Sequence, residues 1–540
     1  MTRQAAIEAI FPAEADIPPQ FRVDPVHQTE YLADGKLCRW DGPAQEVRSG
    51  MWVRTPAGVA PKVIGSFPLL TETEAQAALD AAVRAYDSGH GDWPTLPVPR
   101  RIEHIEQFTL RMVEKRAEVV NLIMWEIGKS YADALREFDR TVQYIRDTID
   151  ALKDLDRAGS RFTLQDGIIA QIRRAPLGVV LCMGPYNYPL NETFTLLIPA
   201  LITGNTTVFK PPRMGALLYR PLLEAFRNSF PPGVVNMVYG VSSRVMPPLM
   251  ASGKIDVFAF IGSSGAADSL KKLHPKPHRL RSVLGLEAKN AAIILPDADL
   301  DLAVRECVLG ALSFNGQRCT AIKMIFAHRA ILDEFLHRFC AAIGALKIGM
   351  PWDEGVNLTP LPSPAEVQRQ VDFVADAIQH GAQVVNEDGG AVNGTFFYPA
   401  VLYPVNDRMR LYHEEQFGPT VPVAAFDAIE TPIRYIAASN YGQQASIFGS
   451  DPDVIADLID PLVNQVCRLN LNSQCQRGPD TFPFTGRKDS AEGTLSVSDA
   501  LRVFTIRTLV AAKSNDLNKA LITEIVRERK SNFLSTDFIF

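Results

Sequence analysis

Two stretches of the chain alternate between short apolar runs rich in β-branched residues and segments long enough for a helix. The first stretch, from Gly167 to Phe260, contains the runs GVVLCM, TTVFK, VVNMVY and DVFAF, separated by segments such as NETFTLLIPALI. The second begins at NAAIIL and ends near Leu471. Strands that alternate with helices form βαβ units around a parallel sheet. The sequence therefore predicts an α/β protein with two such units, the first on the Rossmann-type frame that commonly binds dinucleotides.

The remaining segments surround these two units. A chain of 540 residues is too long for one growing core, so two or three domains are expected. Residues 1 to about 45 are rich in Pro, Asp and Gly and predict an irregular arm, whereas helical periodicity begins at Thr71 and continues through EKRAEVVNLIMWEIG to ALREFDRTVQYIRDTIDALK. The segments 167–178 and 494–510 alternate like strands. After about Ala512 we expect a short helix and an extension.

Composition limits the classes of function. A net charge of −6 gives no basic surface for nucleic acid, although arginines gathered in one pocket can still bind an anion. The seven cysteines lack metal-ligand spacing and indicate a reduced set without a metal site. No apolar run reaches the ~18 residues of a membrane helix, and the N-terminus lacks the pattern of a signal or transit peptide. We therefore expect a cytoplasmic protein that binds neither nucleic acid nor membrane.

Cys319, in the segment SFNGQRCTA, is the candidate nucleophile. An isolated cysteine is more often a buried core thiol. Here Gly316 permits a tight turn before it, and the adjacent Arg318 is expected to lower the pKa of the thiol, which favours the reactive thiolate.

Five ordered motifs extend this reading: GPYNYP at Gly184 to Pro189, TTVFKPP ending at Pro212, FIGSSG from Phe260, NGQRCT around Cys319, and EEQFGP ending at Pro419. In order and spacing the chain resembles the aldehyde dehydrogenase superfamily over roughly residues 60 to 510. The resemblance implies an α/β fold with a Rossmann-type cofactor domain, an α/β catalytic domain and small β-elements for oligomerisation, in a homotetramer or homodimer. The implied boundaries are an N-terminal arm and helical part at 1–165, an oligomerisation hairpin at 166–178, a cofactor-binding core at 179–286, a catalytic domain at 287–475, a return to the cofactor domain with an oligomerisation strand at 476–512, and an extension at 513–540.

The resemblance also implies a covalent mechanism. The Cys319 thiolate attacks an aldehyde carbon, and the hemithioacetal gives a hydride to a nicotinamide. The side-chain amide of Asn187 and the backbone N–H of Cys319 stabilise the oxyanion, where the loss of one donor typically costs about 10²–10³ in rate. The alternative is that Asn187 only turns the chain before Pro189.

The sequence departs from the family at the position of the base that activates water to release the thioester. Members of the family carry a glutamate that opens a Glu-Leu-Gly-Gly-Lys segment, but GLEAKN places Gly285 there and a glutamate two positions later, at Glu287. In an extended segment both positions share a face, about 6.6 Å apart. Glu287 is the candidate base. Two alternatives stay open: a structural glutamate paired with a neighbour, or water activated by another group.

The predicted cofactor is NADP. Lys210 ends a β-rich run and is expected to reach ribose or phosphate, while Gly262 and Ser263 lie at a strand-to-helix junction that suits a pyrophosphate. Family matches place Glu415 and Phe417 beside the nicotinamide. NAD-preferring members commonly carry a glutamate three residues after the lysine, whereas this chain has Arg213, a charge-assisted donor for a 2′-phosphate.

At the positions expected to bind the substrate, the chain resembles one subfamily, the non-phosphorylating glyceraldehyde-3-phosphate dehydrogenases of glycolysis. The matching phosphate-binding positions are Arg140, Tyr188, Arg318 and Arg477. Several arginine forks suit a dianionic phosphate, although any single arginine is by default a solvated surface group. The resemblance implies oxidation of D-glyceraldehyde 3-phosphate to 3-phosphoglycerate. Three alternatives remain: a dehydrogenase of another small aldehyde, a catalytically impaired homologue, and an esterase that uses the same thiol.

Overall fold

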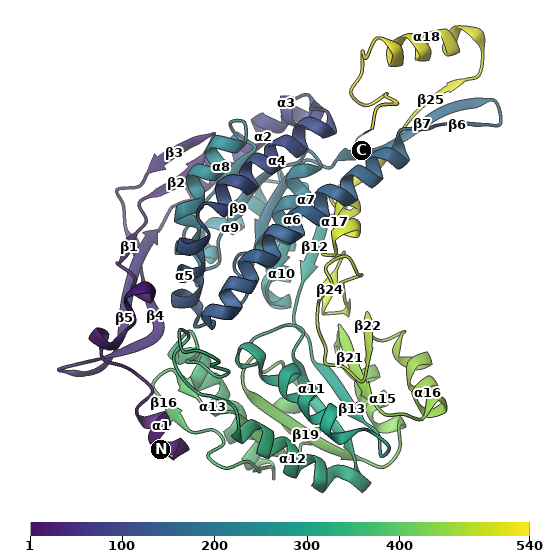
Figure 1. The fold of residues 1–540 in the computed structure, drawn as a ribbon. Helices are drawn as coiled ribbons and strands as arrows, with labels where there is room; N and C mark the ends of the chain where they lie inside the picture. The colour runs from purple at the N-terminus through teal and green to yellow at the C-terminus, as the bar shows by residue number, and fades with distance from the viewer. Residues whose placement is uncertain (1, 539–540) are drawn as a thin grey trace.

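The computed structural model describes residues 2–538, and Figure 1 shows two α/β parts stacked one above the other. The upper part is built on an eight-stranded sheet with the order β24-β12-β11-β8-β9-β10-β2-β3. Its central strands, from β12 to β10, are parallel, and antiparallel strands flank them on both edges. The parallel strands are β8 (Val179–Met183), β9 (Thr206–Lys210), β10 (Val235–Met237), β11 (Val257–Ile261) and β12 (Arg281–Gly285). The predicted Rossmann-like frame is confirmed.

The N-terminal segment contains more strand than its composition indicates. β2 (Glu30–Ala33) and β3 (Lys36–Arg39) form a hairpin, and Leu32 of β2 pairs with Met237 of β10. The expectation of an irregular arm to about residue 45 is wrong here, because the strand pairs with a partner about 200 residues away that local composition does not reveal. β1 (Val26–His27), β4 (Ala44–Thr55) and β5 (Gly58–Pro68) form a separate sheet.

Helices cover the eight-stranded sheet (Figure 1). The predicted helix start at Thr71 is confirmed, since Thr71 caps α2 in a capping box with Glu74. The helical period that follows is interrupted at Glu114 and Lys115. The helices of this part include α2 (Glu72–Tyr86), α3 (Asp92–Thr95), α4 (Val98–Val113), α5 (Arg116–Ile127), α6 (Tyr131–Gly159), α7 (Asn191–Ile202), α8 (Leu223–Ser229), α9 (Ser242–Ala251) and α10 (Ser264–Lys271).

The lower part contains a seven-stranded sheet with the order β15-β18-β19-β14-β13-β21-β22. Every residue of β13 is buried, as expected for a central parallel strand between two layers of helices. The strands are β13 (Asn290–Ile294), β14 (Ile322–His328), β15 (Gln383–Val384), β18 (Ala400–Tyr403), β19 (Thr420–Phe426), β21 (Gln444–Phe448) and β22 (Arg468–Leu471). The helices are α11 (Leu300–Leu312), α12 (Leu332–Gly344), α13 (Pro364–Gln379), α15 (Glu430–Ala438) and α16 (Pro452–Leu462).

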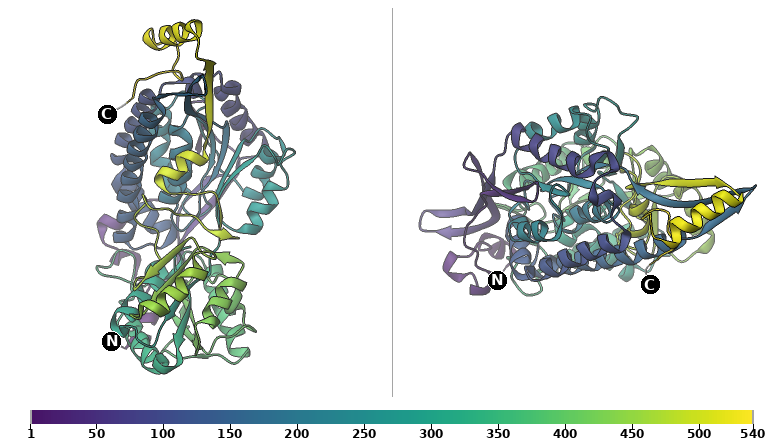
Figure 2. Two further views of the ribbon diagram at one scale, coloured as in Figure 1. Left: turned by 90° about the vertical axis from the view of Figure 1, so that its right-hand side faces the viewer. Right: turned by 90° about the horizontal axis from the view of Figure 1, so that it is seen from above.

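A three-stranded arm extends from the upper part (Figures 1 and 2). It consists of β6 (Phe162–Gln165), β7 (Ile168–Pro176) and β25 (Thr505–Lys513). The expectation of strand across 494–510 is wrong in its first half, where α17 (Val497–Val503) forms because Val497, Ala500 and Leu501 share a buried helical face. The expected helix in the tail is α18 (Asp516–Arg527), which has no buried residue. None of the helices in residues 2–538 is long and apolar enough to cross a bilayer.

Candidate active site

A cavity of about 410 Å³ lies where the two sheets face each other. On one side it is lined by residues at or just beyond the carboxyl ends of parallel strands of the eight-stranded sheet: Gly184 after β8, Arg213 three residues after β9, Gly262 after β11, and Gly285 at the end of β12. Cys319, Glu366 and Phe417 line the opposite side. Carboxyl ends of parallel strands are the usual ligand position in open α/β sheets. The cavity is therefore the candidate site.

The backbone places Cys319 at the wall of this cavity. After α11 the chain turns through Phe314, Asn315 and Gly316, whose φ values of 50°, 53° and 72° are all left-handed. The side chain of Asn315 holds this turn by donating to the Thr359 carbonyl at 3.0 Å and accepting from the Thr359 N–H at 3.2 Å. The half-buried thiol of Cys319 thus faces the cavity from a fixed loop.

Burial raises the pKa of the Cys319 thiol above its usual value of 9.0, and the nearby Glu192 carboxylate raises it further. Lys323 and Arg477 act in the opposite direction. The expectation that Arg318 would lower this pKa is wrong. Its Nη2 instead donates to the carbonyl oxygens of Leu309 and Gly310, at 3.1 and 2.8 Å, and satisfies the end of α11.

Asn187 is buried and held close to the nucleophile's loop. Its Nδ2 donates to the Gln317 carbonyl at 2.8 Å, and its own carbonyl accepts from Lys129 Nζ at 2.8 Å. Lys129 pairs at 2.5 Å with Glu137, which also accepts the N–H groups of Leu190 and Asn191. Lys129, in the loop between α5 and α6, and Glu137, in α6, were not identified from the sequence, because no local pattern shows that they meet under the GPYNYP loop.

Glu287 lines the cavity in the connection between the two sheets. β12 ends at Gly285 and β13 begins at Asn290, so the strand expected to carry both residue 285 and residue 287 stops at the first. The Oε2 atom of Glu287 accepts the backbone N–H of Ser264 at 2.8 Å, in the first turn of α10. Its carboxylate is thus anchored at a helix N-terminus, where negative charge is favourable.

Two cations lie at the end of β9, on the side of the eight-stranded sheet, which is the predicted cofactor side. Lys210, the last residue of β9, is buried, its Nζ donates to the Pro211 carbonyl at 3.0 Å, and burial lowers its pKa to about 8. Arg213 is exposed and forms no ion pair within residues 2–538. Ser263 caps α10 by accepting the Ala266 N–H at 3.3 Å, and Gly262 precedes it.

The predicted nicotinamide-side residues also lie at the cavity. Glu415 pairs with the buried Lys323 and accepts the Ala288 N–H at 3.2 Å. The Phe417 ring lies edge-on to Tyr186, with their centroids 5.8 Å apart. Both side chains therefore have fixed positions on the wall of the cavity opposite Arg213.

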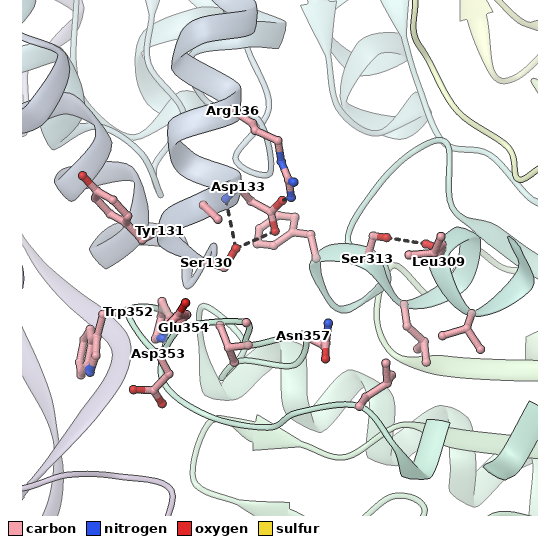
Figure 3. Close-up of a pocket in the computed structure, with 18 residues that line it drawn as sticks. Ser130, Tyr131, Asp133, Arg136, Leu309, Ser313, Trp352, Asp353, Glu354 and Asn357 are labelled. Carbon is pink, nitrogen blue, oxygen red and sulfur yellow. Dashed lines mark hydrogen bonds and ion pairs between the residues drawn. The ribbon is translucent and has the colours of Figure 1, made fainter. Parts of the chain in front are cut away.

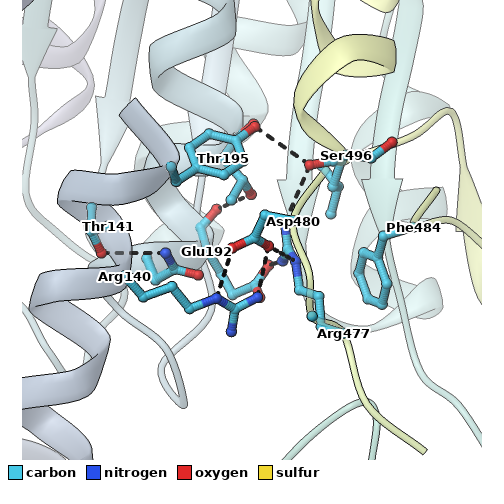
Figure 4. Close-up of polar contacts among 12 residues, drawn as sticks. Arg140, Thr141, Glu192, Thr195, Arg477, Asp480, Phe484 and Ser496 are labelled. Carbon is cyan, nitrogen blue, oxygen red and sulfur yellow. Dashed lines mark hydrogen bonds and ion pairs between the residues drawn. The ribbon is translucent and has the colours of Figure 1, made fainter. Parts of the chain in front are cut away.

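The predicted phosphate-binding arginines are only partly brought together. Arg140 makes a two-pronged contact with Asp480, at 2.8 and 2.7 Å, and Arg477 pairs with both Asp480 and Glu192 (Figure 4). Arg318 is not part of this cluster. Asp480 and Glu192 were not identified from the sequence. Asp480 lies only three residues after Arg477, in the segment QRGPDTFPF, so the signal for one of them was present.

The fourth predicted substrate residue, Tyr188, contacts a lysine instead of joining the arginines. The Lys129 Nζ lies 3.5 Å from the centroid of the Tyr188 ring, a cation–π contact. Its ring also lies edge-on to Phe314, at 6.3 Å between centroids.

A second cavity, of about 550 Å³, lies between the start of α6, the end of α11 and the loop around Trp352 (Figure 3). Its arginine, Arg136, is paired with Asp133, and its other charged groups are the carboxylates Asp353 and Glu354. It contains no cysteine among its lining residues. Within residues 2–538 no group of three side chains suits a metal ion. The Cys319 thiol and the Asn187 amide, which both line the first cavity, thus make it the better reaction site.

Comparison with known proteins agrees with this geometry. The model of the aldehyde dehydrogenase family matches residues 44–510. The chain belongs to the aldehyde dehydrogenase family. This aldehyde dehydrogenase is 29% identical over 490 residues to the NADP-dependent glyceraldehyde-3-phosphate dehydrogenase of Arabidopsis thaliana, covering 89% of this chain and 96% of the relative.

Solved structures show the same fold. The crystal structure of NADP-dependent glyceraldehyde-3-phosphate dehydrogenase from Bacillus halodurans C-125, complexed with NADP, matches with a TM-score of 0.82 and 29% identity, covering 91% of this chain and 100% of that one. Lactaldehyde dehydrogenase from Escherichia coli matches with a TM-score of 0.82 and 27% identity over the same shares of the two chains. The fold is thus common to enzymes named for phosphorylated and for unphosphorylated aldehydes.

Proposed function

We propose that this chain oxidises a small aldehyde to the acid with NADP, and that D-glyceraldehyde 3-phosphate, giving 3-phosphoglycerate, is the first candidate substrate. One observation carries the proposal: Cys319 lines a cavity at the carboxyl edge of a parallel sheet, with Asn187 bonded to the adjacent loop. A nucleophile beside an oxyanion donor at such an edge suits covalent aldehyde chemistry.

In the proposed reaction the Cys319 thiolate adds to the aldehyde carbon, and the carbonyl oxygen becomes an alkoxide. Asn187 has a second amide hydrogen besides the one donated to Gln317, and this hydrogen and the Cys319 N–H stabilise the alkoxide. NADP, when bound, accepts the hydride that leaves the carbon. Water then attacks the thioester on Cys319, the acid departs, and the sulfur is regenerated. Glu287 is the proposed acceptor of the water's proton.

The residues around the cavity fit NADP. Lys210 is a buried cation without a carboxylate partner in residues 2–538, and Arg213 is available for a 2′-phosphate. Gly262 and Ser263 lead into the N-terminus of α10, which suits the pyrophosphate. Glu415 and Phe417 would hold the nicotinamide end. A phosphate that binds at the N-terminus of α10 competes with Glu287 for the Ser264 N–H. We therefore expect cofactor binding to release the Glu287 carboxylate from this hydrogen bond.

The names of the relatives support a phosphorylated substrate, but a second candidate has a specific observation in its favour. Arg477 already pairs with two carboxylates, Glu192 and Asp480, which favours an uncharged hydroxyaldehyde over a phosphorylated one. For assembly we propose a homotetramer or homodimer formed through the β25-β7-β6 arm, which exposes Leu164, Ile506 and Leu509.

The test is to follow the reduced cofactor in phosphate-free buffer, with NAD or NADP and with D-glyceraldehyde 3-phosphate or glyceraldehyde. Steady NADPH formation with either aldehyde supports the proposal, and the better substrate decides between the two candidates. Hydrolysis of an activated ester without any aldehyde oxidation would contradict it in favour of an esterase. A single burst of NADPH without turnover would instead indicate an impaired homologue that cannot release its thioester.

A further inference from the structure

We infer that Glu192 is a specificity-determining residue: its carboxylate competes with the anionic end of a substrate for Arg477, and so shifts selection toward uncharged aldehydes. The inference rests on the proposed oxidation of a small aldehyde. It concerns how the site chooses among aldehydes, which neither the family nor the names of relatives determine.

Glu192 lies in the first turn of α7, directly after the loop that holds Asn187. Its side chain is only 8% exposed, yet it lines the same cavity as Cys319. Its negative charge raises the pKa of the Cys319 thiol. A carboxylate so near the nucleophile will meet whatever group the aldehyde carries.

Each nitrogen of the Arg477 guanidinium already has an acceptor. Its Nη1 pairs with Glu192, its Nε donates to Asp480 at 3.1 Å, and its Nη2 donates to the Leu495 carbonyl at 3.2 Å (Figure 4). The guanidinium is 5% exposed and packs over the Phe484 ring at 4.6 Å. Two of its five N–H groups have no acceptor in residues 2–538, but Arg477 does not line the cavity, whereas Glu192 does. A phosphate in the cavity therefore meets the Glu192 carboxylate before it can contact Arg477.

Asp480 is the harder acceptor to displace, because it also holds both prongs of Arg140. Glu192 has Arg477 as its ion-pair partner in the described structure. The exchange that admits a phosphate is thus between the phosphate and Glu192, and it leaves the Glu192 carboxylate buried beside a second anion.

The charges of the cavity oppose that exchange. Its lining side chains include four glutamates and two arginines, so an incoming dianion meets an excess of negative charge. Charges that share a cavity from which water is largely excluded interact strongly. An uncharged hydroxyl group, in contrast, donates a hydrogen bond to Glu192 and leaves the pair with Arg477 intact.

The decisive variant is Glu192→Gln, which keeps the shape of the side chain and removes its charge. The ratio of kcat/KM for D-glyceraldehyde 3-phosphate to kcat/KM for glyceraldehyde is expected to rise roughly ten- to hundredfold, the range of one charge-assisted hydrogen bond. Calorimetric titration with 3-phosphoglycerate and with glycerate should show the same shift in binding, without any chemistry. Glu192→Ser provides a second variant if the first is poorly folded.

Asp156→Asn is the matched control, since Asp156 forms a buried pair with Arg173 far along α6 and does not line the cavity. It should leave both ratios unchanged. A folded Glu192 variant whose ratios stay the same or fall would overturn the inference and assign Glu192 a purely structural role. If no aldehyde is oxidised by any variant, the proposed function fails, while the titrations still decide whether Glu192 competes with the phosphate.

Discussion

The cations on the two sides of the cavity differ in how far their charge is already compensated. On the cofactor side, Lys210 donates only to a backbone carbonyl and Arg213 is exposed without an ion pair in residues 2–538. On the substrate side, Arg140 and Arg477 share Asp480, and Arg477 also binds Glu192. Lys210 and Arg213 are therefore available to an anion, whereas Arg140 and Arg477 must first lose a carboxylate partner.

An arginine at a position that matches the family can therefore be free to bind an anion or already be paired with a carboxylate. A motif can place an arginine correctly and say nothing of the carboxylate that faces it from another element. Four predictions test whether the cations of the two sides differ in charge compensation and whether both sides act in the reaction at Cys319.

Removal of the sulfur should have the largest effect, because both sides of the cavity would then face no nucleophile. Cys319→Ser is expected to reduce kcat for aldehyde oxidation by up to about 10⁶-fold, the scale seen when a covalent nucleophile is lost. The measurement is NADPH formation under saturating aldehyde. Cys340→Ser, in α12 and away from the cavity, is the control and should retain the wild-type rate.

Removal of a paired arginine should cost far more stability than removal of an unpaired one. Arg477→Ala leaves Glu192 and Asp480 without this buried partner and is expected to lower the free energy of unfolding by about 3–5 kcal/mol. Arg213→Ala, at an exposed position, should change it by less than about 0.5 kcal/mol. Denaturant unfolding of both variants checks this, and equal losses would abolish the distinction between the two sides.

Reversal of the charge of Arg213 should change the choice of cofactor. Arg213→Glu is expected to reduce the preference for NADP over NAD by roughly ten- to a hundredfold, since one charged hydrogen bond to the 2′-phosphate is lost and a repulsion is added. The ratio of kcat/KM for the two cofactors measures it. Arg227→Glu, an exposed change in α8, should leave that ratio unaltered.

The smallest expected effect is on the titration of the nucleophile. Burial and Glu192 favour the neutral thiol, so the pKa of Cys319 lies above 9.0 and its alkylation by iodoacetamide should keep accelerating as pH rises past that value. Glu192→Gln should move the midpoint to lower pH. A wild-type midpoint below that of an ordinary thiol would show that the substrate-side carboxylate does not act on the sulfur.

Much of the fold follows from local pattern. The alternating runs correctly predicted both parallel sheets. Of the residues that the motifs singled out, Cys319 and Asn187 line one cavity, and Lys210 ends a strand of the adjoining sheet. The β2–β3 hairpin and α17 were missed because long-range pairing and a short buried face leave little local signal. Glu192 was missed as a partner of Arg477 for the same reason: it lies 285 positions away in sequence, and a single glutamate in an apolar helix segment does not reveal what it faces.

The most direct test of covalent catalysis by Cys319 is to identify the residue that carries the substrate during turnover. Wild-type enzyme mixed with NADP and aldehyde, quenched within the first turnover and digested, should yield an acyl adduct on the peptide that contains Cys319, as measured by mass spectrometry. NADPH formation with the adduct on another residue, or with Cys319 unmodified throughout, would contradict the central claim.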